Sequence, residues 1–181
     1  ERGFATLAIG KWHLTPMREA SAVGPFGDWP LQRGFDRYYG FMQGETDQFH
    51  PELYEDNRLV DQPRTPEEGY HVTEDLVDRS IDLIRTQHTM VPERPFFLYL
   101  AFGATHAPHQ APDAYLEKWR GRFDDGWDVA RQRVYSNQLA MGVIPPNTDL
   151  APRNPGVEPW DDLSADEQAL ACRLQEAFVA M

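Results

Sequence analysis

The chain has 181 residues, of which 41% are hydrophobic, and this is enough for one domain with a buried core. Its formal net charge of −12 creates a field that repels nucleic acid, which proteins bind through clustered Lys and Arg. No apolar run reaches the roughly 18 residues that a membrane-spanning helix needs. We therefore expect a soluble protein with neither nucleic acid nor membrane as partner, and the single cysteine, Cys172, excludes an internal disulfide.

The first half of the chain predicts a strand, a long irregular segment and a helix. Residues Phe4 to Ile9 form an apolar run that Gly10 ends, which is typical of a buried strand. From Thr15 to about Thr65 the sequence is rich in Gly, Pro, Asp and aromatic residues and lacks a helical period. We expect this segment to be an ordered excursion without regular structure. A helix is then predicted from an N-cap at Thr73 to about Gln87.

The second half predicts one more strand and three helices. Phe96 to Phe102 is a continuous apolar run, typical of a strand covered on both faces. Helices are predicted at Ala114 to Arg120 and at Val129 to Met141, and Ser164 with Glu167 predicts a capping box before the last helix. That helix has apolar residues at helical spacing: Leu170, Leu174, Phe178 and Met181. Strands alternating with helices indicate an α/β domain around a mainly parallel sheet flanked by helices.

Two loops that follow the apolar strands carry the residues best suited to chemistry. Lys11 and His13 follow the first strand, and His106 and His109 follow the second. Ligands of open α/β sheets bind at the carboxyl ends of strands, so Lys11, His13 and His106 converge if the two strands are parallel neighbours. A lysine and two imidazoles at one edge would hold a tetrahedral anion and exchange protons near neutral pH. Taken singly, each histidine is more often a structural group, and spacing alone predicts an anion site without a reaction.

Two other patterns are weaker candidates for metal sites. His106 and His109 have a spacing seen in zinc sites, but their loop contains proline and has no nearby Cys or third His, so we predict no metal here. The acidic run from Asp124 to Asp128 lacks the alternating ligands of a calcium loop. We interpret that run as a turn into the next helix.

Motifs spread over nearly the whole chain resemble one enzyme family. The segment Gly10 to Leu14 (GKWHL) after a strand resembles the second signature of type I sulfatases, in the alkaline phosphatase superfamily. Four further segments resemble a bacterial arylsulfatase subgroup: RGFDRYYGF from Arg33, ETDQFHPELY from Glu45, PFFLYLAFGATHAPHQAP from Pro95 and FDDGWD from Phe123. The resemblance implies that residues 1–181 are the central part of a single sulfatase catalytic domain with an alkaline-phosphatase-like fold, truncated at both ends.

The resemblance also implies a role for each matched residue. Lys11 is similar to the lysine that binds the sulfate oxygens and the hydrated aldehyde nucleophile. His13 resembles the histidine that hydrogen-bonds this nucleophile and assists sulfate release, and His106 the one that contacts sulfate and protonates the departing alcohol. His109 lies in the same motif as a substrate-pocket residue without a chemical role. The implied reaction hydrolyses a small-molecule sulfate ester to an alcohol or phenol plus sulfate.

The departures from the family pattern concern its catalytic equipment. The family's nucleophile is a Cys or Ser in a Cys/Ser-x-Pro-x-Arg motif, oxidised to formylglycine. Cys172 is followed by Arg173-Leu174-Gln175-Glu176, so it does not match and is predicted to be a thiol buried in a helix. The acidic and Asn ligands of the family's calcium site and its second lysine are also unmatched. We expect calcium and formylglycine to be held outside residues 1–181, and these residues alone to be inactive.

Alternatives to a sulfate ester hydrolase remain open at this point. One is a phosphonate or phosphate ester hydrolase of the same superfamily. Another is a non-catalytic module that keeps Lys11 and His106 to bind sulfated ligands. The bacterial cytoplasm and the periplasm are both compatible with the sequence.

Overall fold

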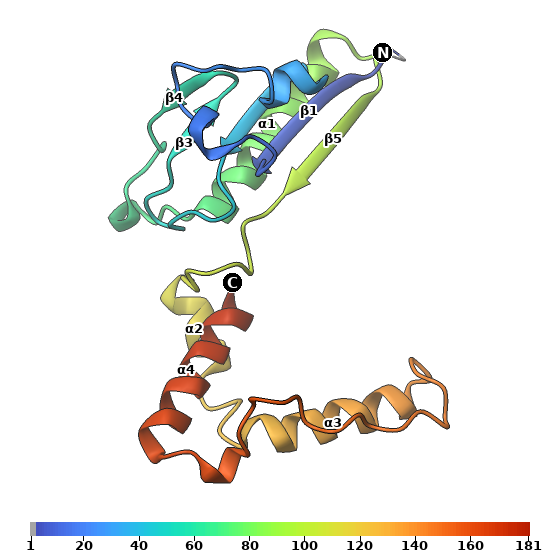
Figure 1. Cartoon of the computed structure of the whole chain (residues 1–181). Helices are drawn as coiled ribbons and strands as arrows, with labels where there is room; N and C mark the ends of the chain where they lie inside the picture. Colours follow the sequence, from blue (N-terminus) through green and yellow to red (C-terminus); the bar gives the residue numbers. More distant parts are fainter. Residues whose placement is uncertain (1–2) are drawn as a thin grey trace. The chain divides into compact units, whose positions relative to one another are not determined.

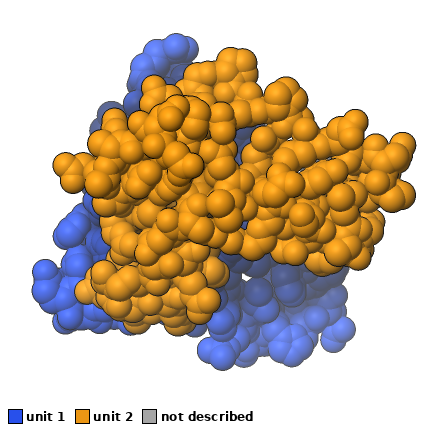
Figure 2. Space-filling model, turned by 90° about the horizontal axis from the view of Figure 1, so that it is seen from below, with its two compact units in different colours: residues 1–111 blue, residues 112–181 orange. Residues whose placement is uncertain are grey.

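The computed structural model describes residues 3–181, which belong to two compact units, residues 1–111 and residues 112–181 (Figure 1; Figure 2). Of the described residues, the first unit contains a sheet and one long helix, whereas the second is helical. Two compact units can both belong to one catalytic domain. The predicted single domain therefore stays a prediction.

The first unit is built on a five-stranded sheet with the strand order β4-β3-β2-β1-β5. β1 (Ala5–Lys11) lies between β2 (Arg37–Phe41) and β5 (Phe96–Ala101) and runs parallel to both. At one edge, β3 (Leu53–Glu55) and β4 (Arg58–Val60) add two antiparallel pairings. The predicted α/β architecture is confirmed, and its three parallel strands, β2, β1 and β5, are adjacent in the sheet.

The segment between Thr15 and Thr65 contains more regular structure than the sequence predicted, which corrects that expectation. β2, β3 and β4 all lie in it, together with short 3-10 helices at Met17–Glu19 and Pro30–Arg33. The run RYYGF of β2 gives no strand signal because Gly40 interrupts it and its apolar residues do not alternate with polar ones. Burial on both faces of the sheet, rather than local preference, makes it a strand.

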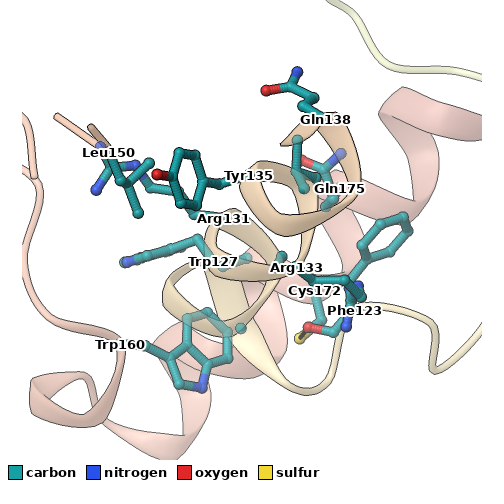
Figure 3. A pocket seen from close by; sticks show the side chains of 14 residues that line it. Phe123, Trp127, Arg131, Arg133, Tyr135, Gln138, Leu150, Trp160, Cys172 and Gln175 are labelled. Carbon is teal, nitrogen blue, oxygen red and sulfur yellow. Dashed lines mark hydrogen bonds between the residues drawn. The ribbon is translucent and has the colours of Figure 1, made fainter. Parts of the chain in front are cut away.

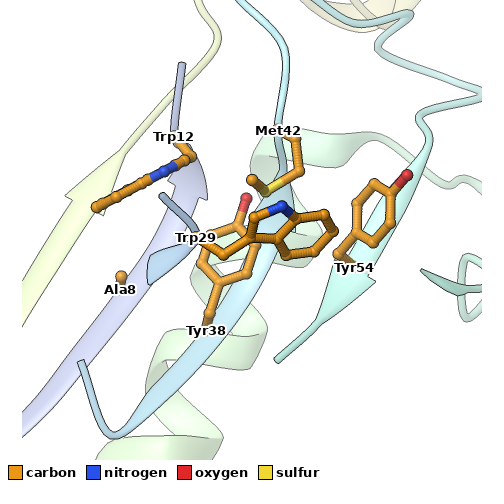
Figure 4. Close-up of a cluster of buried hydrophobic side chains, with 6 residues drawn as sticks. All are labelled: Ala8, Trp12, Trp29, Tyr38, Met42 and Tyr54. Carbon is orange, nitrogen blue, oxygen red and sulfur yellow. The ribbon is translucent and has the colours of Figure 1, made fainter. Parts of the chain in front are cut away.

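Aromatic side chains from this segment cover one face of the sheet (Figure 4). Trp29 is fully buried and meets both Phe26 and Tyr54 edge-on, with ring centroids 5.0 Å apart in each pair. Large rings in edge-to-face contact bury much apolar area and add a specific geometry. The buried cluster consists of Ala8, Trp12, Trp29, Tyr38, Met42 and Tyr54.

Helix α1 (Val72–Met90) packs on the sheet through a second buried cluster. Leu76 of α1 belongs to this cluster together with Ile9 of β1, and the Tyr39 hydroxyl donates to the Asp75 carboxylate at 2.7 Å. The N-cap is His71, whose Nδ1 accepts from the backbone N–H of Thr73, so the predicted N-cap at Thr73 is wrong by two positions. An imidazole replaces the usual hydroxyl cap because tertiary contacts hold it there, as described below.

β5 is the edge strand of the described sheet, which corrects the expectation that both its faces are covered. Phe97 is 53% exposed and Tyr99 is 41% exposed. Phe35 packs against this face, with ring centroids 6.4 Å from Phe97 and 6.2 Å from Tyr99. The continuous apolar run predicted the strand correctly, but it could not give the strand's place in the sheet.

The second unit contains α2 (Asp113–Trp119), α3 (Gly126–Ala140) and α4 (Ala165–Ala180). The capping box of Ser164 and Glu167 is confirmed at the start of α4. The apolar residues of α4 that recur at helical spacing are not buried, as Leu170 is 59% exposed. No helix among residues 3–181 combines the length and the apolar character that crossing a bilayer requires.

Candidate active site

Three loops leave the sheet at the carboxyl ends of its parallel strands. Gly10 pairs with Ala101 and Lys11 with Phe41, so β1, β2 and β5 end side by side. The backbone N–H of His13 donates to the Met42 carbonyl at 3.1 Å, which extends this pairing past the end of β1. The condition on which the predicted anion site depends, parallel and neighbouring strands before Lys11 and His106, is therefore met.

Two glycines bring the three strands unusually close just before the loops begin. A Cβ on Gly10 would lie 1.9 Å from the Ala101 carbonyl oxygen, and one on Gly40 would lie 2.1 Å from the Gly10 carbonyl oxygen. Gly10 also adopts φ 102°, a conformation that side chains rarely allow. Backbone contact thus requires glycine at both positions, and these glycines allow β1, β2 and β5 to lie close together where they end.

Trp12 anchors the segment that carries Lys11 and His13. Its side chain is buried in the aromatic cluster, and its indole Nε1 donates to the Asp28 carbonyl at 2.8 Å (Figure 4). Successive side chains of a strand alternate between faces, so burying Trp12 keeps the neighbouring Lys11 off the buried cluster. Lys11 is partly exposed at the end of β1.

His13 has an uncommon backbone conformation and lies against the loop after β2. In an extended segment Lys11 and His13 would point to the same side, but the φ of His13 is 51°, in the left-handed region, so the backbone is not extended there. A Cβ on Gly44 would lie 2.7 Å from Cε1 of the His13 imidazole. Non-glycine residues with positive φ cluster at functional sites, and here Gly44 leaves the space that the ring occupies.

His106 lies in the loop after β5 and also contacts the loop after β2. Its Nδ1 lies 2.9 Å from the Ala107 carbonyl and 3.4 Å from Oε2 of Glu45. The His106 side chain is 50% exposed and that of Glu45 is 63% exposed. His109, three positions further along, is partly exposed in the same loop. The loop after β2 therefore contacts both candidate catalytic histidines, His13 through Gly44 and His106 through Glu45.

Gln110 ties the loops after β2 and β5 together through partly buried hydrogen bonds. Its Oε1 accepts from the Gln48 backbone N–H and its Nε2 donates to Asp47 Oδ2, both at 2.8 Å. The Gln110 carbonyl lies 3.1 Å from Nε2 of His71, which fixes the imidazole that caps α1. Burial would raise the pKa of Asp47, but hydrogen bonds from Gln110 and from the backbone of Phe49 and His50 hold it below its ordinary value.

Sequence reasoning missed Gly44, Glu45 and Gln110. Glu45 and Gly44 follow β2, which the sequence did not reveal as a strand, so their position at the carboxyl end was hidden. Gln110 gives no local signal, since its importance comes from partners more than 60 positions away. Identifying RYYGF as a third parallel strand would have directed attention to the residues that follow it.

Among residues 3–181, no group of three or more His, Cys, Asp or Glu is placed to hold a metal ion. Of the acidic run after Phe123, Asp124 and Asp125 lie in the predicted turn, where Asp125 pairs with Arg133, but Asp128 lies in α3, which begins at Gly126, three residues before the predicted start. Cys172 is buried in α4, where its Sγ donates to the Phe123 carbonyl at 3.4 Å and burial raises its pKa.

The second unit contains a separate pocket of about 520 Å³ (Figure 3). Aromatic rings of Trp127 and Trp160 form part of its wall, with centroids 4.9 Å apart. Its two arginines are already engaged, since Arg131 donates to the Ala151 carbonyl and Arg133 pairs with Asp125. None of the candidate anion-binding residues lines it.

Comparison with known proteins establishes the class to which this fold and these motifs belong. The family model described as Sulfatase matches residues 1–176, and the chain belongs to the sulfatase family. An uncharacterised sulfatase of Schizosaccharomyces pombe, PB10D8.02c, is 32% identical across the whole chain, which covers 33% of that protein. The arylsulfatase of Klebsiella aerogenes is 28% identical, again across the whole chain and over 38% of the enzyme.

Solved structures agree with this assignment. The crystal structure of Ps i-CgsB matches with a TM-score of 0.52 and 25% identity, over 66% of this chain and 28% of that one. The same protein has been solved in complex with k-i-k-neocarrahexaose. The chain spans between about a quarter and two fifths of the length of these relatives. A source in bacteria stays a prediction, since the relatives include a fungal protein.

Proposed function

We propose that the whole protein hydrolyses sulfate esters and that Lys11, His13 and His106 act in that reaction. The observation that carries the proposal is the arrangement of the parallel strands. β1 and β5 are parallel neighbours, so Lys11 at the end of β1 and the loops that carry His13 and His106 lie at the same end of the sheet. Membership of the sulfatase family supports the same conclusion. The substrate class is a small-molecule sulfate ester, and the products are an alcohol or phenol and sulfate.

Each residue has a physical task in this proposal. Cleavage of the S–O bond places negative charge on the departing oxygen, and groups that are fixed in advance stabilise this charge better than water does. Lys11 holds the sulfate oxygens, His13 supports the attacking group and the release of sulfate, and His106 protonates the departing oxygen. His109 borders the substrate. Because the chain carries a net charge of −12, a sulfate anion must be captured by these local groups against the overall field.

Sulfatases generally use a formylglycine nucleophile and a divalent metal, for which we propose calcium here. The described residues do not fit either group: they contain no metal-ligand cluster, and Cys172 is buried in a helix without the Pro-x-Arg context. We assign no step of the reaction to these groups. The part that this chain supplies is the binding of the anion and the movement of a proton.

Sulfate is favoured over the alternatives by the comparisons. The relatives described above bear the name sulfatase or arylsulfatase, and none of those names refers to phosphate or phosphonate hydrolysis. A non-catalytic sulfate-binding module would need Lys11 and His106, but it would not need a proton donor. The following experiment distinguishes the two.

The whole protein carrying His106→Ala is assayed with two aryl sulfates that differ in the acidity of the phenol released. A poor leaving group needs protonation, so kcat should fall roughly 10²-fold or more, while the good leaving group should lose much less. Equal losses with both esters would remove His106 as the proton donor. Absence of turnover by the unaltered protein with either ester would contradict the proposed function itself.

A further inference from the structure

The contact between Glu45 and His106 bears on which ring nitrogen of His106 can donate a proton to a ligand. Two oxygen atoms lie near Nδ1 of the imidazole, the Ala107 carbonyl at 2.9 Å and Glu45 Oε2 at 3.4 Å. Both oxygens accept hydrogen bonds, so together they favour a proton on Nδ1. Among the described residues, no hydrogen bond occupies Nε2 of His106, which leaves that nitrogen for a ligand.

Glu45 is held near His106 by the buried part of its own loop. Gln48 is only 1% exposed, and its backbone N–H donates to the Gln110 side chain. The Gln48 carbonyl in turn accepts from the Val72 N–H at the start of α1. The segment carrying Glu45 and the segment carrying His106 are thus joined by Gln110 a few residues beyond each of them. These hydrogen bonds of Gln110 limit how far Glu45 and His106 can separate, although both side chains are exposed to solvent.

We propose that Glu45 is a positioning residue for His106, keeping the Nδ1 proton in place so that Nε2 faces the departing oxygen of the substrate. The inference rests on the proposed sulfate ester hydrolysis. In the step concerned, an attacking oxygen nucleophile forms a bond to sulfur while the bond from sulfur to the departing oxygen breaks, and the electron pair of the broken bond passes to the departing oxygen. That oxygen takes the proton from Nε2 of the imidazolium, and the Nδ1 proton stays between His106, Ala107 and Glu45. The carboxylate of Glu45 begins and ends the step deprotonated.

The test is a double-mutant cycle in the whole protein, with Glu45→Ala, His106→Ala and the double variant. With a poor leaving group, Glu45→Ala should lower kcat roughly tenfold, and with a good leaving group it should have little effect. In the His106→Ala background, Glu45→Ala should cause no further loss, because Glu45 acts through the missing imidazole. The same loss with both esters, or the same loss without His106, would overturn the proposal.

Two further variants guard against a merely structural effect. Glu45→Gln keeps the size of the side chain and removes its charge, and its loss should be smaller but depend on the leaving group in the same way. Glu93→Ala is the matched control, because Glu93 is an exposed acid before β5, at the end of the strand opposite His106. Its turnover should equal that of the unaltered protein, and a loss like that of Glu45→Ala would contradict the proposal.

A measurement without substrate separates this inference from the proposed function. The ¹⁵N signals of the neutral His106 ring report which nitrogen carries the proton. The unaltered protein should show the Nδ1–H form, and Glu45→Ala should raise the population of the Nε2–H form. Unchanged populations would overturn the role of Glu45 even in an active enzyme. A protein that cleaves no sulfate ester would instead contradict the proposed function and leave this result standing.

Discussion

At the scale of single residues, the site depends on small side chains as much as on charged ones. The His13 imidazole occupies space that exists because residue 44 is glycine. Gly44 has an ordinary backbone conformation, so contact with His13, and not a turn requirement, explains the glycine here. A glycine beside the ring can therefore decide where the His13 imidazole lies.

Replacing Gly44 by Ala should displace the His13 ring, because the new Cβ would lie 2.7 Å from Cε1. The ring can move, so the free energy of unfolding should change by less than about 1 kcal/mol. Turnover of an aryl sulfate by the whole protein should nevertheless fall roughly 10- to 100-fold. Gly27→Ala is the matched control, since nothing lies within 4 Å of its added Cβ, and its kinetics should be unchanged. Equal activity of the two variants would show that the position of His13 does not matter.

The sequence predicted the place of a residue in the sheet where that residue follows an apolar strand. Lys11, His13 and His106 were found in this way, and the structure puts their strands side by side. Glu45 and Gln110 were missed because their positions follow from tertiary pairing. The roles assigned to Lys11, His13, His106 and His109 stay predictions until the variants are measured.

At the scale of elements, the site is formed by the close approach of β1, β2 and β5. Apolar runs predicted β1 and β5 to within two residues at each end. β2 was not predicted, because Gly40 breaks the apolar pattern for a reason visible only in the sheet, where it contacts the Gly10 backbone. Helix ends were predicted well where capping is local, as at Ser164, and poorly where a distant contact supplies the cap, as at His71.

Replacing Gly10 by Ala should destabilise the first unit by about 2 to 5 kcal/mol, combining backbone strain with a collision against the Ala101 carbonyl. Gly34→Ala separates these two costs. Gly34 has a similar φ of 101°, but nothing lies within 4 Å of its added Cβ, so only about 1 to 2 kcal/mol should be lost. The shift of the urea unfolding midpoint, followed by circular dichroism, measures both. A Gly10 variant as stable as the Gly34 variant would contradict the close packing of β1 against β5.

At the scale of the whole molecule, an acidic protein is proposed to bind an anion. The chain has 17 Lys and Arg and 29 Asp and Glu side chains, and the proposed ligands of the anion are one lysine and two histidines. The composition predicts that nucleic acid is not a partner, but it could not show that a small anionic ester is the substrate, because acidic side chains outnumber basic ones. The proposal of a small anionic ester as substrate comes from family membership and from the order of the strands.

Binding of sulfate or vanadate by the whole protein, measured by isothermal titration calorimetry, tests the central claim most directly. Lys11→Ala should weaken binding about tenfold or more, because it removes a charge-assisted hydrogen bond to the anion. Lys118, the chain's other lysine, lies over the Tyr115 ring in α2, and Lys118→Ala should bind as tightly as the unaltered protein. Equal affinity of the Lys11 and Lys118 variants would contradict an anion site at the carboxyl ends of β1 and β5.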